Sequence, residues 1–295
     1  MRNEKRIYAL GFFDGVHLGH QALLQICRAM AQQYRCGTAA ITFEAHPQSL
    51  FSKDIPPLIS TTQDRQMLLQ SYGMEKIHIF PVSLNVMSTP WEAFLTQLLR
   101  DGAAGFVCGD DFRFGHRGEG NAQKLQHFCR QHALPCTIVP EQLLYGKRIS
   151  SSLIRHLIES GEMESATHFL GHPHILTGHV LHGQKIGRKI GVPTANLVIP
   201  DDIVVPKFGV YACRVVIDGK HYPAVANVGI RPTVSGSGIT VEPWILDFTG
   251  DLYGKALRLE FHRFLRAEIK FSDLDALKQQ IQKDAVQTRR YFEMH

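Results

Sequence analysis

The stretch at residues 11–21 decides the expected fold of the first half of the chain, and it reads Gly11-Phe12-Phe13-Asp14-Gly15-Val16-His17-Leu18-Gly19-His20-Gln21. It links the apolar run Ile7–Phe13, typical of a buried strand, to His20–Arg35, where apolar residues recur at helical spacing. In an open parallel sheet such a turn binds ligands, because free N–H groups and the helix dipole favour an anion. His17 and His20 can both point into this turn, and Gly19 lets the backbone approach a phosphate closely. The alternative is two surface histidines beside an ordinary glycine-rich turn.

Outward from this turn, short apolar runs alternate with segments of helical spacing. Strands are expected at Thr38–Phe43, Lys76–Phe80, Gly105–Cys108 and Cys136–Val139, and helices at Asp64–Tyr72, Pro90–Arg100 and Glu119–His132. Thr89-Pro90-Trp91-Glu92 predicts a capping box with proline at the first helical position. The alternation predicts a Rossmann-like α/β domain, with a parallel sheet covered by helices on both faces.

From about Gly171 the pattern changes to short strands without crossover helices. Expected strands are Gly209–Ile217, His221–Val228, Val241–Phe248 and Ala256–Phe264, with Asp218-Gly219 as a tight hairpin turn and a final helix after Ser272. This pattern predicts an antiparallel β barrel with a terminal helix. We therefore expect an α/β domain at residues 1–170 and a β domain at residues 171–295.

Composition narrows the classes of function. The chain has 295 residues and a formal charge of +5, which is too small an excess to indicate nucleic acid as a partner. No apolar run approaches the roughly 18 residues that a membrane-spanning helix needs, and no secretory signal is visible. The six cysteines form no CxxC pair, so we expect reduced thiols in a cytoplasmic protein that binds small molecules.

Two further clusters in the first half carry groups that bind anions or metals. Residues 148–155 read Arg148-Ile149-Ser150-Ser151-Ser152-Leu153-Ile154-Arg155, where hydroxyls at a helix start are flanked by two arginines. A plain serine cap is the alternative there. Residues 109–115 read Gly109-Asp110-Asp111-Phe112-Arg113-Phe114-Gly115, whose adjacent carboxylates could serve a metal, a sugar hydroxyl or only a solvated turn.

The second half carries a different phosphate signature at residues 183–196. Gly183, Gly187 and Gly191 recur at four-residue intervals around Arg188, in a stretch that could fold over a polyphosphate or form a simple turn. Thr194 and Asn196 face the same side of an extended chain, and such an oxygen pair could ligate Mg²⁺. Glu242 is the lone carboxylate of an apolar strand that also holds Trp244, which suggests a general base or a solvent-facing residue.

The first-half motifs resemble the nucleotidylyltransferase superfamily, and more narrowly the FMN adenylyltransferase module of bacterial bifunctional FAD synthetases. The resemblance rests on residues 11–21, 109–115 and 148–155, and on Phe43-Glu44-Ala45-His46-Pro47. It implies that His17 and His20 steady the transferred phosphoryl group and that Asp111 stands near the transfer site. It also implies ATP-binding roles for Gly11, Phe13, Asp14 and Gly19, and contacts to the β- and γ-phosphates from Arg148, Ser151, Ser152 and Arg155.

The second-half motifs resemble riboflavin kinase. The resemblance rests on residues 187–196, 206–211, 227–233 and 242–254, and on Phe261-His262-Arg263-Phe264-Leu265-Arg266. It implies a six-stranded barrel, Mg²⁺–ATP bound by Thr194 and Asn196, and Glu242 as catalytic base. With the glycine spacing, it predicts phosphate binding by Gly183, Gly187, Arg188 and Gly191. The chain departs from the pattern at Pro243-Trp244, where the family usually has a small or aliphatic residue and then histidine.

Together the two resemblances imply an enzyme that phosphorylates riboflavin to FMN and adenylylates FMN to FAD, with ATP and Mg²⁺. Three alternatives remain at this stage. One is an enzyme with a single active module, another is an adenylyltransferase for a different nucleotide, and the third is a flavin-binding regulator without turnover.

Overall fold

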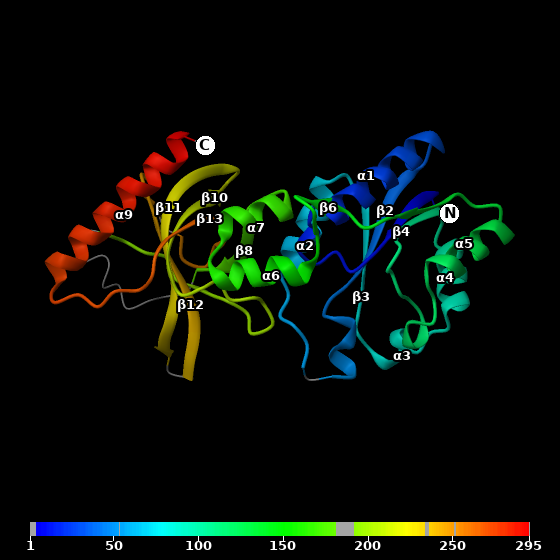
Figure 1. The fold of residues 1–295 in the computed structure, drawn as a ribbon, viewed down its shortest axis with the longest axis horizontal. Coiled ribbons are helices and arrows are strands. Elements are labelled where there is room, and N and C mark those ends of the chain that lie inside the picture. The colour runs from blue at the N-terminus through cyan, green and yellow to red at the C-terminus, as the bar shows by residue number, and fades with distance from the viewer. Residues whose placement is uncertain (1–3, 53, 181–191, 234–235, 251, 295) are drawn as a thin grey trace. The chain divides into compact units, whose positions relative to one another are not determined.

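The computed structural model describes residues 4–52, 54–180, 192–233, 236–250 and 252–294 (Figure 1). The chain divides into two compact units: Met1–Leu58 with Thr62–Ser151, and Ile59–Thr61 with Ser152–His295. The helices of residues 151–170 therefore group mainly with the second unit. The functional boundary expected after residue 170 stays a prediction.

The first unit is built on a parallel sheet in the order β3-β2-β1-β4-β5. Its strands are β1 (Arg6–Leu10), β2 (Gly37–Phe43), β3 (Lys76–Phe80), β4 (Ala103–Gly109) and β5 (Cys136–Val139). The helices are α1 (Leu18–Gln33), α2 (Thr62–Ser71), α3 (Leu84–Met87), α4 (Trp91–Arg100) and α5 (Ala122–Gln131), with 3₁₀ turns η1 (Asp14–Val16), η2 (Pro47–Leu50) and η3 (His116–Gly118). The parallel α/β fold predicted from the sequence is confirmed.

Helices cover both faces of this sheet because side chains alternate along each strand. Tyr8 and Leu10 of β1 pack in one core cluster with Leu95 of α4 and Phe128 of α5. Their neighbours Ile7 and Ala9 are also fully buried, and α1 contacts the same strands. A strand buried on both faces explains the continuous apolar runs in the sequence.

The capping box predicted at Thr89 is wrong. Pro90 is the residue before α4 rather than its first helical residue, and no side chain caps that end. The Thr89 hydroxyl instead donates a 3.0 Å hydrogen bond to the carbonyl of Asn85 in α3.

The second unit is built on an antiparallel sheet in the order β8-β13-β10-β11-β12-β9. Its strands are β8 (His174–His179), β9 (Leu197–Val198), β10 (Gly209–Ile217), β11 (Lys220–Thr233), β12 (Gly236–Ile245) and β13 (Ala256–Arg266). A Cβ added to Gly178 of β8 would lie 3.6 Å from the Leu197 side chain of β9, so the two edges approach each other. The six-stranded barrel predicted from the sequence is confirmed as a nearly closed antiparallel sheet.

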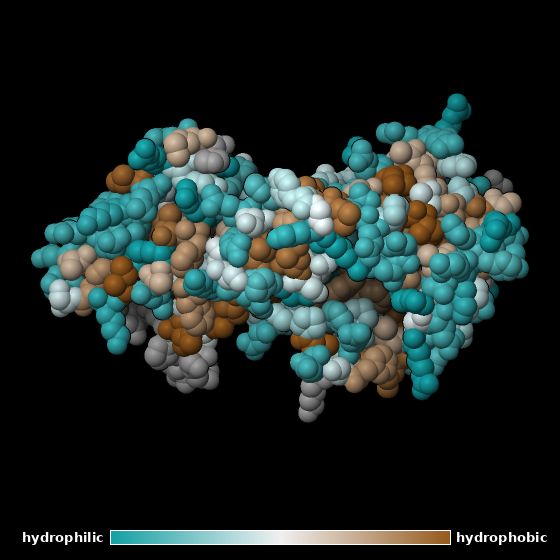
Figure 2. Space-filling view, in the orientation of Figure 1, coloured by the Kyte–Doolittle hydropathy of each residue, from teal (hydrophilic) through white to brown (hydrophobic). Residues whose placement is uncertain are grey.

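Two features complete this unit. Asp218 and Gly219 form the predicted hairpin turn with φ values of 50° and 77°, as a two-residue hairpin turn requires. The terminal helix α9 (Leu274–Met294) lies along β10 and β11, while α6 (Ser151–Ser160) and α7 (Met163–Leu170) precede β8 (Figure 1). The outer side of α9 is mostly hydrophilic in the view of Figure 2.

Candidate active sites

The turn after β1 depends on an unusual backbone. Phe13 has left-handed torsion angles, with φ of 59°, and its ring is fully buried. A Cβ on Gly11 would lie 2.9 Å from that ring, so glycine is the residue that fits at this position. These constraints lead the chain directly into α1, whose N-cap is His17.

The two histidines of this turn form one unit. His17 Nδ1 accepts a hydrogen bond from the backbone N–H of His20 at 3.3 Å, and the two rings stack with centroids 3.7 Å apart. Burial holds the pKa of His20 well below its ordinary value, with smaller contributions from His17 and the cation of Arg65. The Nδ1 atom of His20 is buried without a hydrogen-bond partner among the described residues. A neutral His20 can therefore donate or accept a hydrogen bond without carrying a charge.

A cavity of about 390 Å³ opens at this turn. The predicted residues that line it are Gly11, His17, Gly19, His20, Asp111, Arg148 and Ser151. Arg148 projects from the hairpin of β6 (Leu143–Leu144) and β7 (Lys147–Arg148). Its guanidinium donates to Asp111 Oδ2 at 2.8 Å and pairs with Glu141 Oε1 at 2.9 Å. The cavity thus brings two imidazoles, a hydroxyl and a guanidinium together, which is a set suited to phosphate oxygens.

A second cavity of about 790 Å³ adjoins the first and shares residues such as Phe12 and Phe112 with it. Its wall is largely aromatic and also contains His46 and Arg113. The Phe112 and Phe114 rings stack with centroids 5.6 Å apart, and Phe12 meets His46 edge-on at 5.4 Å. An apolar cavity of this size could hold a planar ring system next to the phosphate groups.

In the second unit, a row of side chains crosses the barrel wall at Glu242. Asn227 of β11 stands opposite Glu242 of β12, and Val210 and Arg266 continue the row on β10 and β13. On the other side, β9 pairs Val241 with Leu197, and Thr194 bridges to Trp244. The same register sets Asn196 opposite Glu242. Because directly opposed residues share one face of a sheet, amide side chains flank the carboxylate from both neighbouring segments.

This row forms one wall of a third cavity, of about 380 Å³. Glu242, Asn227 and Thr194 supply its polar side, and Leu277 and Ile281 of α9 contribute an apolar side. Glu242 is half-buried. The cavity therefore combines a carboxylate, amide and hydroxyl groups with an apolar surface, which suits an amphiphilic substrate.

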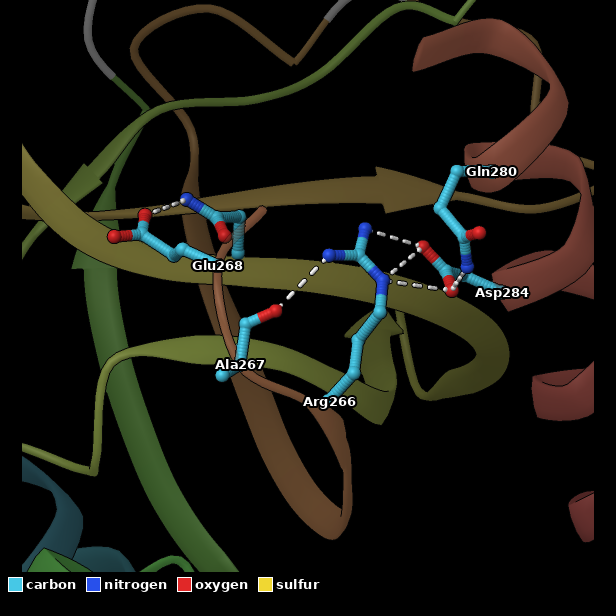
Figure 3. A network of polar contacts seen from close by, with 6 residues as sticks. Arg266, Ala267, Glu268, Gln280 and Asp284 are labelled. Carbon is cyan, nitrogen blue, oxygen red and sulfur yellow. Dashed lines mark hydrogen bonds and ion pairs between the residues drawn. The ribbon is translucent and has the colours of Figure 1, made fainter. Parts of the chain in front are cut away.

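Arg266 and Asp284 connect α9 to this wall (Figure 3). Arg266 Nε lies 3.1 Å from both Asp284 oxygens and its Nη2 lies 2.8 Å from Oδ2, while Gln280 donates to Asp284 Oδ1 at 2.9 Å. Asn227 Nδ2 donates to Glu268 Oε1 at 3.2 Å. These contacts fix the elements that enclose the cavity.

Two family models match the chain: FAD synthetase over residues 1–153 and riboflavin kinase over residues 170–292. The bifunctional riboflavin kinase/FMN adenylyltransferase of Listeria monocytogenes is 34% identical over 97% of this chain and 92% of its own, and that of Pseudomonas fluorescens is 35% identical over 98% and 94%. The chain belongs to the bifunctional riboflavin kinase/FMN adenylyltransferase family. A crystal structure titled as a macrolide-efflux protein from Streptococcus pneumoniae is also similar, with a TM-score of 0.85 and 30% identity over 98% of this chain and 97% of its own.

Membership of the riboflavin kinase/FMN adenylyltransferase family confirms the function and the enzyme class predicted from the sequence. The protein is a transferase whose FAD synthetase part is N-terminal and whose riboflavin kinase part is C-terminal. Its substrates are accordingly ATP, riboflavin and FMN. None of the described helices has the length and apolar character needed to cross a membrane.

Several residues predicted for the two sites of this family do not line the cavities. Phe13 and Asp14 are buried beneath the turn. Ser152 and Arg155 lie on α6, which belongs to the second unit from residue 152 onward. Asn196 is half-buried beside β12 but does not line the third cavity. Gly183, Gly187, Arg188 and Gly191 lie outside the described residues.

Sequence reasoning missed other residues of the two sites. Glu141 beside Arg148 gives no sequence signal, because an acidic residue in a loop is ordinary. Asn227 stands in the motif Asn227-Val228-Gly229, but only the β11–β12 register shows that it faces Glu242. The aromatic wall could have been anticipated from the clustered phenylalanines of residues 109–115.

Proposed function

We propose that the cavity at the turn after β1 binds ATP for adenylyl transfer and that the adjoining aromatic cavity binds the flavin ring of FMN. The observation that carries this assignment is the shared wall between the two cavities at Phe12 and Phe112. A substrate with its ring in the larger cavity would present its phosphate beside His17 and His20. Placing two reactants side by side in this way supplies much of the rate of a group transfer.

In this reaction an oxygen of the FMN phosphate attacks the α-phosphorus of ATP, and pyrophosphate leaves. The neutral His20, with His17, would donate hydrogen bonds to phosphoryl oxygens as charge develops on them. Arg148 and Ser151 would hold the departing β- and γ-phosphates, and the resemblance adds Ser152 and Arg155 to this set. Gly11, Phe13, Asp14 and Gly19 would shape the turn, and Asp111 would orient Arg148.

For the kinase reaction we propose that Glu242 accepts the proton of the ribityl 5′-hydroxyl as that oxygen attacks the γ-phosphorus of a second ATP. Thr194 and Asn196 carry hydroxyl and amide oxygens of the kind that Mg²⁺ prefers, so these two residues would hold the ion. When bound, Mg²⁺ would neutralise charge on the phosphates.

We further propose that the two functional parts divide near residue 170 and that the protein is cytoplasmic, without nucleic acid or membrane as a partner. The proposal is supported by the six cysteines, which are free thiols of the kind that a reducing compartment maintains. Gly183, Gly187, Arg188 and Gly191 are proposed to cover the phosphates of the kinase ATP.

A product time course from riboflavin and Mg²⁺–ATP tests the kinase assignment, with FMN and FAD resolved. Glu242→Gln is expected to slow FMN formation by about 10²- to 10⁴-fold, the usual contribution of a general base, while FAD formation from supplied FMN continues. Unchanged FMN formation would show that Glu242 is not the base.

The paired change His17→Ala with His20→Ala is the reciprocal test for adenylyl transfer. It is expected to abolish conversion of FMN to FAD while riboflavin is still phosphorylated. If FAD formation persisted at the original rate, the adenylyl-transfer site would lie elsewhere.

A further inference from the structure

Trp244 stands beside the proposed kinase base on the same face of β12. Side chains two residues apart on a strand point the same way and lie about 7 Å apart along it. Glu242 and Trp244 both line the third cavity, as do Asn227 and Val225, the residues opposite them on β11. A substrate group that reaches Glu242 therefore has its neighbouring atoms beside the indole of Trp244.

Neighbouring residues hold the Trp244 side chain and its backbone in place. Trp244 packs against a buried cluster that includes Val210 and Val225 of the barrel and Ala285 of α9. Its backbone is also fixed, because Thr194 bridges to it and the Ala195 N–H donates to the Pro243 carbonyl at 3.0 Å. Trp244 thus packs on this buried cluster and also lines the cavity.

The cavity has both polar and apolar lining residues. Glu242 and Asn227 lie in one cross-strand row, and Trp244 and Val225 lie in the next. Leu277, Ile281 and Phe271 add apolar surface, and the Arg266–Asp284 pair and Glu268 add charged groups. Riboflavin likewise combines the two characters, since a planar aromatic ring system carries a five-carbon polyol that ends in the reacting hydroxyl. Its ring fits the apolar surface and its polyol extends toward Glu242.

We propose that Trp244 is a specificity-determining residue of the kinase reaction, whose indole stacks on the isoalloxazine ring of riboflavin. The proposal rests on the assignment of this cavity to the kinase reaction. It gives a function to the position at which the chain departs from the usual family pattern. The indole acts on substrate binding, and Glu242 acts on the chemical step.

Steady-state kinetics of FMN formation by the full chain separate these two roles. Trp244→Ala is expected to raise KM for riboflavin by about 5- to 150-fold, the range measured when an aromatic platform under a stacked base is removed. The kcat is expected to change little, which also shows that the variant is folded. Trp244→Phe keeps a ring and is expected to retain most of the affinity.

Flavin fluorescence supplies a readout that a merely structural role would not move. An indole in contact with an excited flavin quenches its emission by transient electron transfer, which phenylalanine does not do. Of the described residues that line the two proposed flavin cavities, Trp244 is the one tryptophan, and none is a tyrosine. Trp244→Phe should therefore brighten bound riboflavin. The matched control is Trp91→Phe, which changes the other of the two tryptophans and lines neither cavity.

The outcomes distinguish the stacking role of Trp244 from the assignment of the third cavity to the kinase reaction. If Trp244→Ala leaves KM for riboflavin unchanged, or Trp244→Phe leaves the emission of bound riboflavin unchanged, the stacking role is wrong. If Glu242→Gln retains full kinase activity, the cavity assignment itself fails. Loss of activity in Glu242→Gln with unchanged KM and emission in the Trp244 variants would overturn the stacking role alone.

Discussion

The ion pair between Arg266 of β13 and Asp284 of α9 should be a major source of stability in the kinase part. The Asp284 side chain is 1% exposed and that of Arg266 is 18% exposed. Removing one partner of a buried pair leaves an uncompensated charge and costs about 3–5 kcal/mol. Because Arg266 keeps some contact with water, we expect Asp284→Asn to lower the free energy of unfolding by about 3 kcal/mol, at the lower end of that range.

Urea denaturation of the full chain, followed by circular dichroism, measures this effect. With a slope of about 1–3 kcal/mol per molar urea, a loss of about 3 kcal/mol lowers the midpoint of the affected transition by roughly 1–3 M. The change should also raise KM for riboflavin, since Leu277 and Ile281 of the same helix line the kinase cavity. Formation of FAD from supplied FMN should be unaffected.

Two comparisons make the test decisive. Asp247→Asn breaks an exposed pair with Arg289 and should leave the midpoint close to that of the unmodified protein. Replacing both partners of the buried pair, Arg266→Met with Asp284→Leu, should recover much of the stability lost in Asp284→Asn. Equal midpoints for Asp284→Asn and Asp247→Asn would refute the reasoning.

Three other predictions concern single residues. Gly11→Ala places a Cβ 2.9 Å from the Phe13 ring, so it should destabilise the turn by about 1–3 kcal/mol and slow FAD formation from FMN, with kinase activity as control. Glu141→Gln removes an ion-pair partner 2.9 Å from Arg148 and leaves the guanidinium freer to bind the phosphates of ATP. Because the pair is exposed, KM for ATP in adenylyl transfer should fall by only about two- to fivefold. A higher KM would contradict this reasoning. Burial, with a smaller effect of His172, lowers the pKa of His174 to about 3, so folding disfavours its protonation. Neutral His174 therefore contributes stability above its unfolded pKa of about 6.5. As the pH falls from there to 5, the free energy of unfolding should drop by about 2 kcal/mol. Denaturation curves of His174→Gln should not show this drop.

The sequence predicted several strands well where a short apolar run marks them. Runs such as Lys76–Phe80 and Cys136–Val139 are strands with the expected bounds. The first strand was placed too long, since β1 ends at Leu10 and the left-handed backbone at Phe13 begins a turn. Apolar character alone does not reveal that change of torsion angle.

Site residues could be predicted where several reactive or anion-binding side chains lie close together in the sequence. The histidine turn and the serine–arginine cluster carry their signals locally, and His17, His20, Arg148 and Ser151 meet in one cavity. Contacts between distant segments were not predictable, because they depend on sheet register. Asn227 and Glu268 are 41 positions apart, and neither is distinctive before the strand order β13-β10-β11 is known.

Neighbouring side chains also distinguish Glu260 of β13 from Glu242 of β12. Glu260 of β13 is paired with Arg258 at 3.1 Å and lies 3.5 Å from His221, so the Arg258 cation stabilises its charge and it belongs to the structure of the barrel. Glu242 has amides as its cross-strand neighbours and lines a cavity with an apolar wall. A carboxylate that lines such a cavity lies where a substrate hydroxyl can reach it, as the proposed role of Glu242 as a base requires.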